Sequence, residues 1–389
     1  MTLPTLLLLI LIFLLFIIVL IDIFPQLYTW QSRIHIGRIT DKEIWKNKIM
    51  QKSLAWITAM PTIKLTDNSR LIIIDILKGN YKRTAIQSWQ EASLLLGLTA
   101  YYKTTKNAKT KTKIDTFVNS KIDANGNWKK QPTEIDEVIL AYAIINIPWI
   151  DHEKFKQSYD VIYNLIMNLK GIDGTVAYKK HNTNYRFVDT IGFICPFLIN
   201  YGVKFNNNEA VELSVKQITT YNHLGMLQNT FLPCHTYNIN SKLPVGLFGW
   251  GRGLGWYAIG LIDSYTALPT NNSNKKILEG SIVQFAKTAI QFQNENGSWS
   301  WIVSQNESRQ DSSTTATLAW FLENAATIEE ISLDCKNAKN KAIKYLMQVT
   351  RRDGAIDFSQ GDTKAIGIHS QEFNILPFTQ GFTLRVSCK

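Results

Sequence analysis

Long apolar stretches alternate with amphipathic ones along most of this chain. Six stretches are nearly all apolar and have helical spacing: TAIQSWQEASLLLGLTAYY from Thr84, TEIDEVILAYAII from Thr133, YRFVDTIGFICPFLINYG from Tyr185, GWGRGLGWYAIGLIDSY from Gly249, DSSTTATLAWFLENAA from Asp311 and FNILPFTQGFTLRV from Phe373. Six less apolar stretches alternate with them, at about 41–60, 107–120, 151–170, 207–223, 273–294 and 333–350. This pattern predicts pairs of helices, each with one half-buried and one fully buried member.

A turn motif recurs between the members of several pairs. Asp-Gly or Asn-Gly turns occur in DANGNW at 123–128, GIDGTVAY at 171–178, NENGSWSW at 294–301 and RRDGAIDF at 351–358. Each turn is followed by a short piece typical of a β-strand. The recurrence indicates an internal repeat made of an outer helix, a turn and an inner helix.

The repeats predict an all-α fold, an (α/α)6 barrel. A helix that is apolar all round must be buried on all sides, so six such helices ringed by six amphipathic ones form a closed toroid. The alternative is an open solenoid, which would need capping repeats. The last stretch stays apolar to the C-terminus, which favours closure. All outer-to-inner connections then fall at one end of the barrel, where we expect a functional site.

The N-terminus carries an apolar run, LLLLILIFLLFIIVLI at 6–21, close to the roughly 20 residues of a membrane span. No Lys or Arg precedes it and no small-residue cleavage site follows, which favours a retained single-pass anchor over a cleaved signal peptide. Basic residues after the run weakly favour a cytoplasmic domain: Arg33, Arg38, Lys42, Lys46 and Lys48. The predicted domains are a transmembrane anchor at 1–26, a juxtamembrane linker at 27–40 and the toroid at 41–389, in a protein of the cell membrane.

Composition and charge exclude several classes of partner. The 389 residues are 45% hydrophobic and 19% charged, as in globular proteins. The net charge of +11 is spread along the chain without a dense basic block, so we expect no nucleic acid; an anionic substrate or a membrane surface fits as well. The four cysteines have no CxxC spacing, so neither a zinc site nor a disulfide framework is predicted, and we expect no metal or cofactor.

The segment GWGRGLGW, at 249–256, has the composition of a ligand site. Its glycines let the backbone approach a ligand, Trp250 and Trp256 offer flat faces, and Arg252 offers a planar fork for a carboxylate. Together they suit an acidic sugar. The glycine spacing does not match a phosphate-binding loop. The alternative is that the glycines allow close helix packing and the tryptophans belong to the core.

Two acids are candidates for proton transfer. Asp189 lies in the first turn of an apolar helix, where burial would raise its pKa and suit a proton donor. An acid there could instead only face the positive end of the helix dipole. Asp136 lies near the start of the preceding inner helix, so the two carboxylates could converge. Paired carboxylates with separated pKa values are typical of glycosidic chemistry.

Other candidates lie in the connections. His235 is in the long connection before the Arg252 helix, and could equally be a surface residue. Trp128 follows one of the turns and could stack on a sugar ring or plug the end of the barrel. For Asp311, in DSSTT, the sequence favours a helix cap over a role in the site. No Ser-His-Asp, Cys-His or HExxH pattern is present.

Several of these segments resemble a known family. RGLGW, with Arg252 and Trp256, resembles the RGxxW signature of the unsaturated glucuronyl and rhamnogalacturonyl hydrolases, glycoside hydrolase families 88 and 105. FVDTIGFICPFLINYG is similar to their segment with the catalytic aspartate, here Asp189. GSWSWIVSQNESRQDSSTTATLAWFL resembles their turn, strand and helix, although QDSST replaces the usual ETS-type helix start. The resemblance extends from about Thr84 to Lys389.

The resemblance implies the (α/α)6 fold and an unusual hydrolysis. Those enzymes hydrate the C4–C5 double bond of a terminal unsaturated uronic acid, and the resulting hemiketal collapses and releases the sugar. Asp189 would donate the proton to C4 and activate the water that adds to C5. Asp136 matches a second acid of the family. His235, Arg252 and Trp256 match residues that contact substrate, and no metal is implied.

Some segments depart from the family. EIDEV, around Asp136, is not its usual sequence, and most members lack an anchor. The C-terminal DGAIDFSQGDTKAIGIHS…LPFTQGFTLR is more similar to a toroid protein of bacterial surface-polysaccharide biosynthesis. Our leading hypothesis is a hydrolase of acidic or unsaturated uronyl oligosaccharides acting through Asp189. The alternative is a non-catalytic glycan-binding or assembly protein of polysaccharide biosynthesis. In both, the partners are an acidic oligosaccharide or polysaccharide and a membrane.

Overall fold

A closed ring of inner helices forms the centre of the molecule. The computed structural model describes residues 2–63, 67–79, 87–305 and 307–389; Thr84, where the first predicted inner stretch starts, lies outside them. Within the described residues the ring has six members: α4 (Ser88–Thr105), α6 (Val138–Ile145), α8 (Val188–Lys204), α10 (Gly251–Ala267), α12 (Ser312–Ala325) and α14 (Pro377–Ser387). Each packs on the next, and α14 packs on α4. The predicted closed barrel is therefore confirmed, and the open solenoid is wrong.

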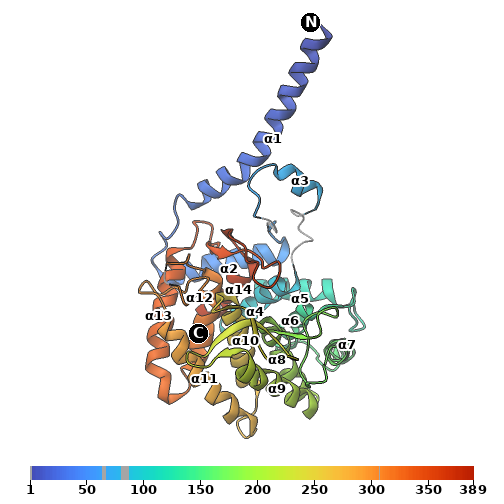
Figure 1. The fold of residues 1–389 in the computed structure, drawn as a ribbon, viewed down its shortest axis with the longest axis vertical. Helices are drawn as coiled ribbons and strands as arrows, with labels where there is room; N and C mark the ends of the chain where they lie inside the picture. The colour runs from blue at the N-terminus through green and yellow to red at the C-terminus, as the bar shows by residue number, and fades with distance from the viewer. Residues whose placement is uncertain (1, 64–66, 80–86, 306) are drawn as a thin grey trace.

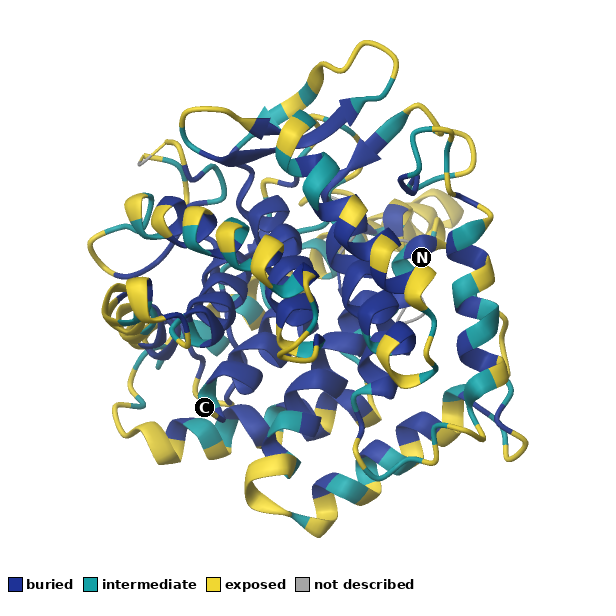
Figure 2. Cartoon of the chain, turned by 90° about the horizontal axis from the view of Figure 1, so that it is seen from below, coloured by how far each residue is buried: buried dark blue, intermediate teal, exposed yellow. Residues whose placement is uncertain are grey.

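A second layer of helices surrounds this ring. Its members are α2 (Lys42–Thr58), α5 (Ala108–Lys121), α7 (Lys156–Met167), α9 (Asn208–Leu224), α11 (Asn274–Gln291) and α13 (Ser332–Gln348). Figure 1 looks along the barrel, with the inner helices in the middle and α5, α7, α9, α11 and α13 around them. All of α6 is buried, whereas the outer helices bury one face each, as Figure 2 shows. The difference follows directly from the apolar and amphipathic patterns.

The recurring turns have one geometry. Gly126, Gly174, Gly297 and Gly354 all have a positive φ, between 72° and 88°. In each turn, the glycine N–H donates to the carbonyl three residues earlier, and a second backbone bond closes the loop. A Cβ at Gly354 would lie 2.4 Å from the carbonyl oxygen of Lys48, so the turn also needs glycine for packing. The predicted repeat is confirmed in its turns as well as in its helices.

Short strands cover the end of the barrel at which the inner helices begin. β1 (Tyr185–Phe187), β2 (Met226–Leu227) and β4 (Pro244–Phe248) all pair antiparallel with β3 (Leu232–Asn238). A separate hairpin, β5 (Ser359–Gln360) and β6 (Phe373–Asn374), precedes α14. We call this end of the barrel the mouth. It is the end at which the sequence predicts a functional site.

The opposite end of the barrel holds a buried cluster of charged and polar groups. Arg385 donates to Asp263 at 2.7 Å and to the hydroxyl of Tyr142 at 3.1 Å. The indole of Trp320 donates to the other oxygen of Asp263 at 2.8 Å. All four residues come from the later turns of inner helices, and all four are buried. We call this group the basal cluster.

The N-terminal helix α1 (Leu3–Arg33) projects from the rim of the barrel (Figure 1). Among the described residues it is the one helix long and apolar enough to cross a membrane. It runs through the boundary predicted at residue 26, and its end contacts the barrel: Arg33 pairs with buried Asp357 at 2.7 Å, and Gly37 N–H donates to Thr350. Residues 33–37 are thus not a free linker. The division into anchor, linker and toroid stays a prediction.

Candidate active site

Asp189 lies at the mouth, in the first turn of α8 directly after β1. β1 pairs with β3 so that Phe187 faces Thr236, which brings His235 next to the start of α8. The register between β3 and β4 shifts by one residue between Cys234 and Thr236, so that His235 lies opposite the extra residue in β4. The Nε2 atom of His235 lies 3.7 Å from Oδ2 of Asp189. Strand pairing therefore joins two predicted site residues that come from different connections.

Burial favours the protonated form of the Asp189 carboxyl. Its Oδ2 atom is buried and has no hydrogen-bond partner among the described residues, while 14% of the side chain remains exposed. Burial raises the pKa of Asp189 from 3.8 to about 7, and the negative charges of Asp362 and Asp136 add to this; its own backbone N–H and Arg252 oppose it. An acid that reaches solvent and keeps its proton near neutral pH can act as a proton donor.

His235 is held in its neutral form. Burial lowers its pKa to about 4, and the positive charge of His369 adds to this. Its Nδ1 atom is buried without a hydrogen-bond partner in the described part of the chain. Between about pH 4 and 7 both His235 and Asp189 are therefore uncharged. Their 3.7 Å contact is longer than a hydrogen bond, so they are neighbours and not an ion pair.

Asp136 lies in the 3₁₀ turn η2 (Ile135–Glu137), which leads into α6. It accepts a hydrogen bond from Tyr178 at 3.2 Å, and Lys179 lies 3.9 Å away. Burial raises the pKa of Asp136, and the positive charge of Lys179 opposes this. Its charge acts on Asp189 as well. The structure thus brings the two predicted acids to the same end of the barrel.

A third acid, Asp362, was not predicted from the sequence. It follows β5 in the loop that connects to β6, and its carboxylate accepts a hydrogen bond from Gln87 at 2.9 Å. Burial raises its pKa, and the positive charge of Arg252 opposes this. The same loop brings His369, whose ring lies 5.6 Å from that of His235. An acid and a histidine in a loop without periodicity carry no signal that could have singled them out.

Arg252 is the second residue of α10 and is only 2% exposed. Its Nη2 atom donates to the carbonyls of Gln360 and Gly361, the latter at 3.1 Å. Its Nε and Nη1 atoms are buried and have no acceptor within the described residues. A buried guanidinium with two unused donors costs free energy unless an acceptor binds there. A carboxylate could accept from Nη1 or from Nε, which point to different edges of the guanidinium plane.

The two predicted tryptophans of this segment have different surroundings. Trp250 donates its indole N–H to Gln360 at 3.1 Å, and its ring lies 4.7 Å from His235 and 5.0 Å from His369. Trp256 is buried in the barrel interior, with its ring 4.5 Å from Phe193 and 4.8 Å from Phe378. Trp250 therefore belongs to the layer that holds His235. Trp256 lies among the side chains of the core.

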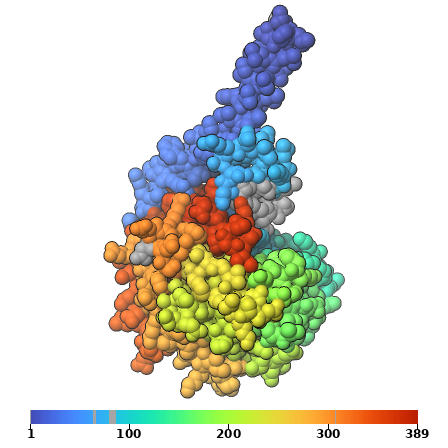
Figure 3. Space-filling view, in the orientation of Figure 1, coloured from blue at the N-terminus to red at the C-terminus, as the bar shows by residue number. Residues whose placement is uncertain are grey.

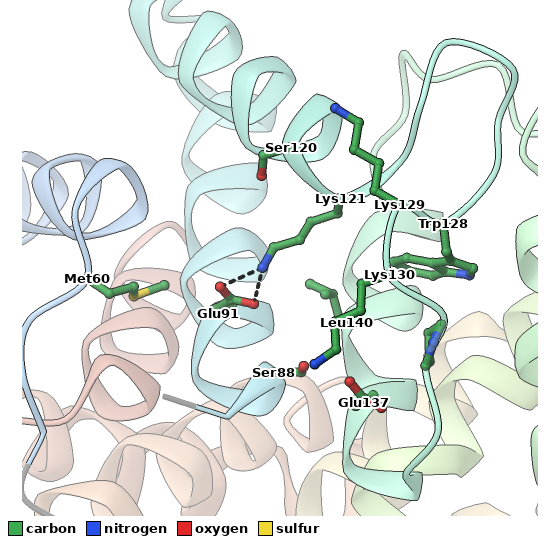
Figure 4. A pocket seen from close by; sticks show the side chains of 11 residues that line it. Met60, Ser88, Glu91, Ser120, Lys121, Trp128, Lys129, Lys130, Glu137 and Leu140 are labelled. Carbon is green, nitrogen blue, oxygen red and sulfur yellow. Dashed lines mark hydrogen bonds and ion pairs between the residues drawn. The ribbon is translucent and has the colours of Figure 1, made fainter. Parts of the chain in front are cut away.

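Trp128 does not join this group. Its indole donates to the carbonyl of Ser158, and it lines a pocket of about 500 Å³ between α4, α5 and α6. Figure 4 shows that pocket, with Lys121 paired to Glu91 and with Lys129 and Lys130 at its edge. Neither Asp189, His235 nor Arg252 lines it. A sugar-binding role for Trp128 stays a prediction.

The predicted helix cap at Asp311 also supports the site. Its buried carboxylate accepts from the backbone N–H groups of Ser313 and Thr314, which confirms the cap. It accepts a further bond from the backbone N–H of Gln360 at 2.9 Å. Gln360 in turn contacts both Trp250 and Arg252. Asp311 thus fixes the β5 strand against α12, and through it the position of the Arg252 guanidinium.

The chain is similar to several known proteins. The family model described as Glycosyl Hydrolase Family 88 matches residues 65–388. The chain is 18% identical over 317 residues to the unsaturated rhamnogalacturonyl hydrolase YesR of Bacillus subtilis (strain 168), covering 79% of this chain and 88% of that protein.

Solved structures share the fold. One is described as a possible member of the GH105 family from Klebsiella pneumoniae subsp. pneumoniae MGH 78578, with a TM-score of 0.74, 17% identity, and coverage of 90% of this chain and 92% of that one. Another is the unsaturated glucuronyl hydrolase of Bacillus sp. GL1, responsible for the degradation of glycosaminoglycan, with a TM-score of 0.66, 14% identity, and coverage of 87% and 94%. At these identities the likeness concerns the fold alone.

Proposed function

The chain belongs to glycosyl hydrolase family 88, and we propose that it releases a terminal unsaturated uronic acid from acidic oligosaccharides, with Asp189 as general acid and base. Its relatives are named for unsaturated rhamnogalacturonyl and unsaturated glucuronyl substrates. Both substrate types share the C4–C5 double bond and the carboxylate at C5. The site of this chain has groups suited to each of these features.

Asp189 and Arg252 together support this function. The first is a partly exposed carboxyl that keeps its proton near neutral pH, and the second is a buried guanidinium with two unused donors. They lie close enough that the charge of Arg252 acts on the pKa of Asp189. A uronate carboxylate bound by Nη1 or by Nε of Arg252 would satisfy one of these donors. It would also hold the neighbouring double bond near the acid.

Asp189 then acts twice in the reaction. Its proton goes to C4, and the resulting carboxylate takes a proton from the water whose oxygen bonds to C5, which restores the acid. Water has thus been added across the double bond, and C5 carries both a hydroxyl group and the ring oxygen. This hemiketal opens to a ketone at C5, and the freed hemiacetal at C1 expels the remaining sugar as an alcohol.

Neighbouring residues position the substrate. His235 is neutral and has a free Nδ1 atom, so it can form a hydrogen bond with a sugar hydroxyl or with the attacking water. Asp136 is held by Tyr178 and adds negative charge that keeps Asp189 protonated. Trp250, which is buried, packs against His235 and fixes the position of its ring. We propose further that α1 anchors the enzyme in a membrane.

Absorbance of the unsaturated uronyl group provides the direct test. Two unsaturated uronyl disaccharides, one ending in rhamnose and one derived from glycosaminoglycan, are each incubated with the protein. The ultraviolet absorbance of their C4–C5 double bond is followed. We expect the absorbance to fall as the neutral sugar is released. Unchanged absorbance with both disaccharides would exclude this mechanism. Binding of the disaccharides without any release would instead support the non-catalytic glycan-binding alternative.

A further inference from the structure

A short apolar segment lies against the N-terminal helix outside the barrel. It is the helix α3 (Ile72–Leu77), with Leu71 before it. Four of its side chains are exposed: Leu71 by 54%, Ile74 by 45%, Ile76 by 43% and Leu77 by 81%. Figure 3 shows this light-blue segment beside the base of the projecting helix. Exposed apolar side chains concentrated on one short element indicate a surface that another apolar phase covers.

Asp22 of α1 fixes the position of this segment. Its two carboxylate oxygens accept the backbone N–H groups of Leu71 and Ile72, each at 2.7 Å. Gln26, one turn further along α1, donates to the carbonyl of Ser69 at 3.4 Å. The start of α3 is therefore capped by α1 itself. Asp22 stands at the end of an apolar run, where a carboxylate needs hydrogen-bond partners, and these bonds supply them.

The length of α1 places Asp22 at a definite depth. At about 1.5 Å per residue, residues 3–21 extend over about 28 Å, close to the roughly 30 Å of a bilayer hydrocarbon core. Asp22 then lies where the hydrocarbon ends. Tyr28 and Trp30, which are exposed, follow about 9 to 12 Å further along, in the region where such aromatic side chains are enriched. A segment attached to Asp22 lies at that boundary too.

We propose that Leu71–Leu77 rests in the interface of the same bilayer that α1 crosses, as a second membrane contact; this rests on the proposed anchoring by α1. Ile74 and Leu77 lie on one face of α3 and are exposed, as is Leu71 before it, whereas Ile72 and Asp75 are buried. Arg70 and Lys78, both exposed, flank the apolar residues and suit anionic lipid headgroups.

This second contact determines how the mouth is presented. Asp67 accepts hydrogen bonds from Ser370 and from the backbone of Gln371, at 2.5 and 3.3 Å, in the loop that also carries Asp362 and His369. This loop connects β5 and β6, and Arg33 holds the other end of that hairpin through Asp357 and the carbonyl of Phe373. The hairpin rim of the mouth thus lies between the base of α1 and the barrel (Figure 3). Held at two points, the enzyme would receive glycans that lie along the membrane surface.

Site-specific fluorescence in vesicles tests this placement. The full-length protein, carrying a small fluorophore at Leu77→Cys, is reconstituted into phosphatidylcholine–phosphatidylglycerol vesicles. Quenching by lipids with a nitroxide near the headgroup is compared with quenching by aqueous iodide. Leu333→Cys is the matched control, because Leu333 is also an exposed leucine, by 71%, but lies at the start of α13. Ile12→Cys reports separately whether α1 is inserted. The wild type, treated with the same fluorophore, shows whether the buried native cysteines remain unlabelled.

We expect the probe at 77 to be quenched several times more strongly by shallow nitroxide lipids than by iodide, and the probe at 333 to show the reverse. Ile76→Cys serves as a second reporter should the first variant misfold, and retained hydrolase activity verifies folding in each. If nitroxide lipids quench the probe at 12 but only iodide quenches the probe at 77, the interfacial contact is overturned while the anchor remains supported. Protection of 77 from both quenchers would indicate a protein partner and overturn it as well. A probe at 12 outside the lipid would overturn both.

Discussion

The two ends of the barrel both bury charged groups, yet they satisfy them differently. In the basal cluster both oxygens of Asp263 accept hydrogen bonds, from Arg385 and from Trp320. At the mouth, Oδ2 of Asp189 and two nitrogens of Arg252 have no partner among the residues described. Unsatisfied buried groups cost folding free energy, so a protein retains them where a ligand completes them. The satisfied groups at the base join the inner helices, and we infer that a substrate completes the unsatisfied groups at the mouth.

The packing around the two ends sharpens the contrast. The basal cluster is built from four inner helices, so it ties the ring together directly. The mouth groups come from helix starts, the β3 strand and the loop between β5 and β6, which join residues far apart in the sequence. We therefore expect substitutions at the base to act on stability and substitutions at the mouth to act on activity. Substitutions of the same type at the two ends should therefore have different effects.

The largest expected effect is on turnover. Asp189→Asn keeps the shape of the side chain and removes the proton that it would donate, so kcat should fall by about 10² to 10⁴. The loss of ultraviolet absorbance of an unsaturated uronyl disaccharide measures this, and titration calorimetry should show that the disaccharide still binds. Wild-type turnover in the variant would show that Asp189 is not catalytic and only faces the helix dipole.

At the base, the corresponding change should act on stability. Asp263→Asn leaves Arg385 charged and without its carboxylate, which should lower the free energy of unfolding by about 3 to 5 kcal/mol. Urea unfolding of the wild type and the variant measures this difference. The double variant with Arg385→Met should recover part of the loss, because no uncompensated charge remains. A variant with wild-type stability, or one that is stable but inactive, would contradict the structural role of the basal cluster.

The same substitution at the mouth should stabilise the fold at high pH. The folded-state pKa of Asp189, about 7, lies above its ordinary value of 3.8, so its neutral form is favoured by folding. The full stability of the wild type is therefore present below about pH 4. It is lost as the pH rises through about 7, because the folded state disfavours the ionised carboxylate. Asp189→Asn should therefore match the wild type near pH 4 and exceed it by about 2 to 4 kcal/mol at pH 8.

Thermal unfolding of the two proteins at pH 4, 6 and 8 gives this comparison. Asp263→Asn, measured alongside, should be less stable than the wild type at pH 6 and 8, and so provides the contrast. If Asp189→Asn were the less stable protein at pH 8, the Asp189 carboxylate would be a satisfied structural group like that of Asp263.

The smallest expected effect concerns Arg252. Arg252→Lys keeps the charge but loses the planar fork, so it should weaken binding of an unsaturated uronyl disaccharide by about 10- to 100-fold, as expected for one charged hydrogen bond. The measurement is KM together with the dissociation constant, and an unchanged melting temperature shows that the fold is intact. Binding equal to that of the wild type would mean that the two free nitrogens of Arg252 do not hold the substrate carboxylate.

Helix periodicity was sufficient to predict the barrel. Stretches such as 138–145 are apolar on every side and can only be buried on every side, and the outer helices show one apolar face. The turns at Gly126, Gly174, Gly297 and Gly354 recur with similar residues because each needs the same positive φ. These are local properties, and a local pattern can be read from consecutive residues.

The site was predictable only in part. Asp189, Asp136, His235 and Arg252 lie at the mouth because the repeat places every outer-to-inner connection there. Asp362 was missed because the loop after β5 has no periodicity, and contacts with residues far away in the sequence, such as Gln87, bring it to the site. The end of α1 was missed for a similar reason, since the partner of Arg33 is Asp357.

The sequence by itself determined the helices, their alternation in two layers, the glycine turns and the family to which the chain belongs. Only the tertiary structure decided which charges are satisfied. Asp189 and Asp263 both stand in apolar inner helices, and neighbouring residues in the sequence do not show which of them meets a guanidinium. Whether a buried carboxylate meets a guanidinium depends on residues brought together across the ring. Pairing of that kind determines whether a charge stabilises the fold or remains free for a substrate.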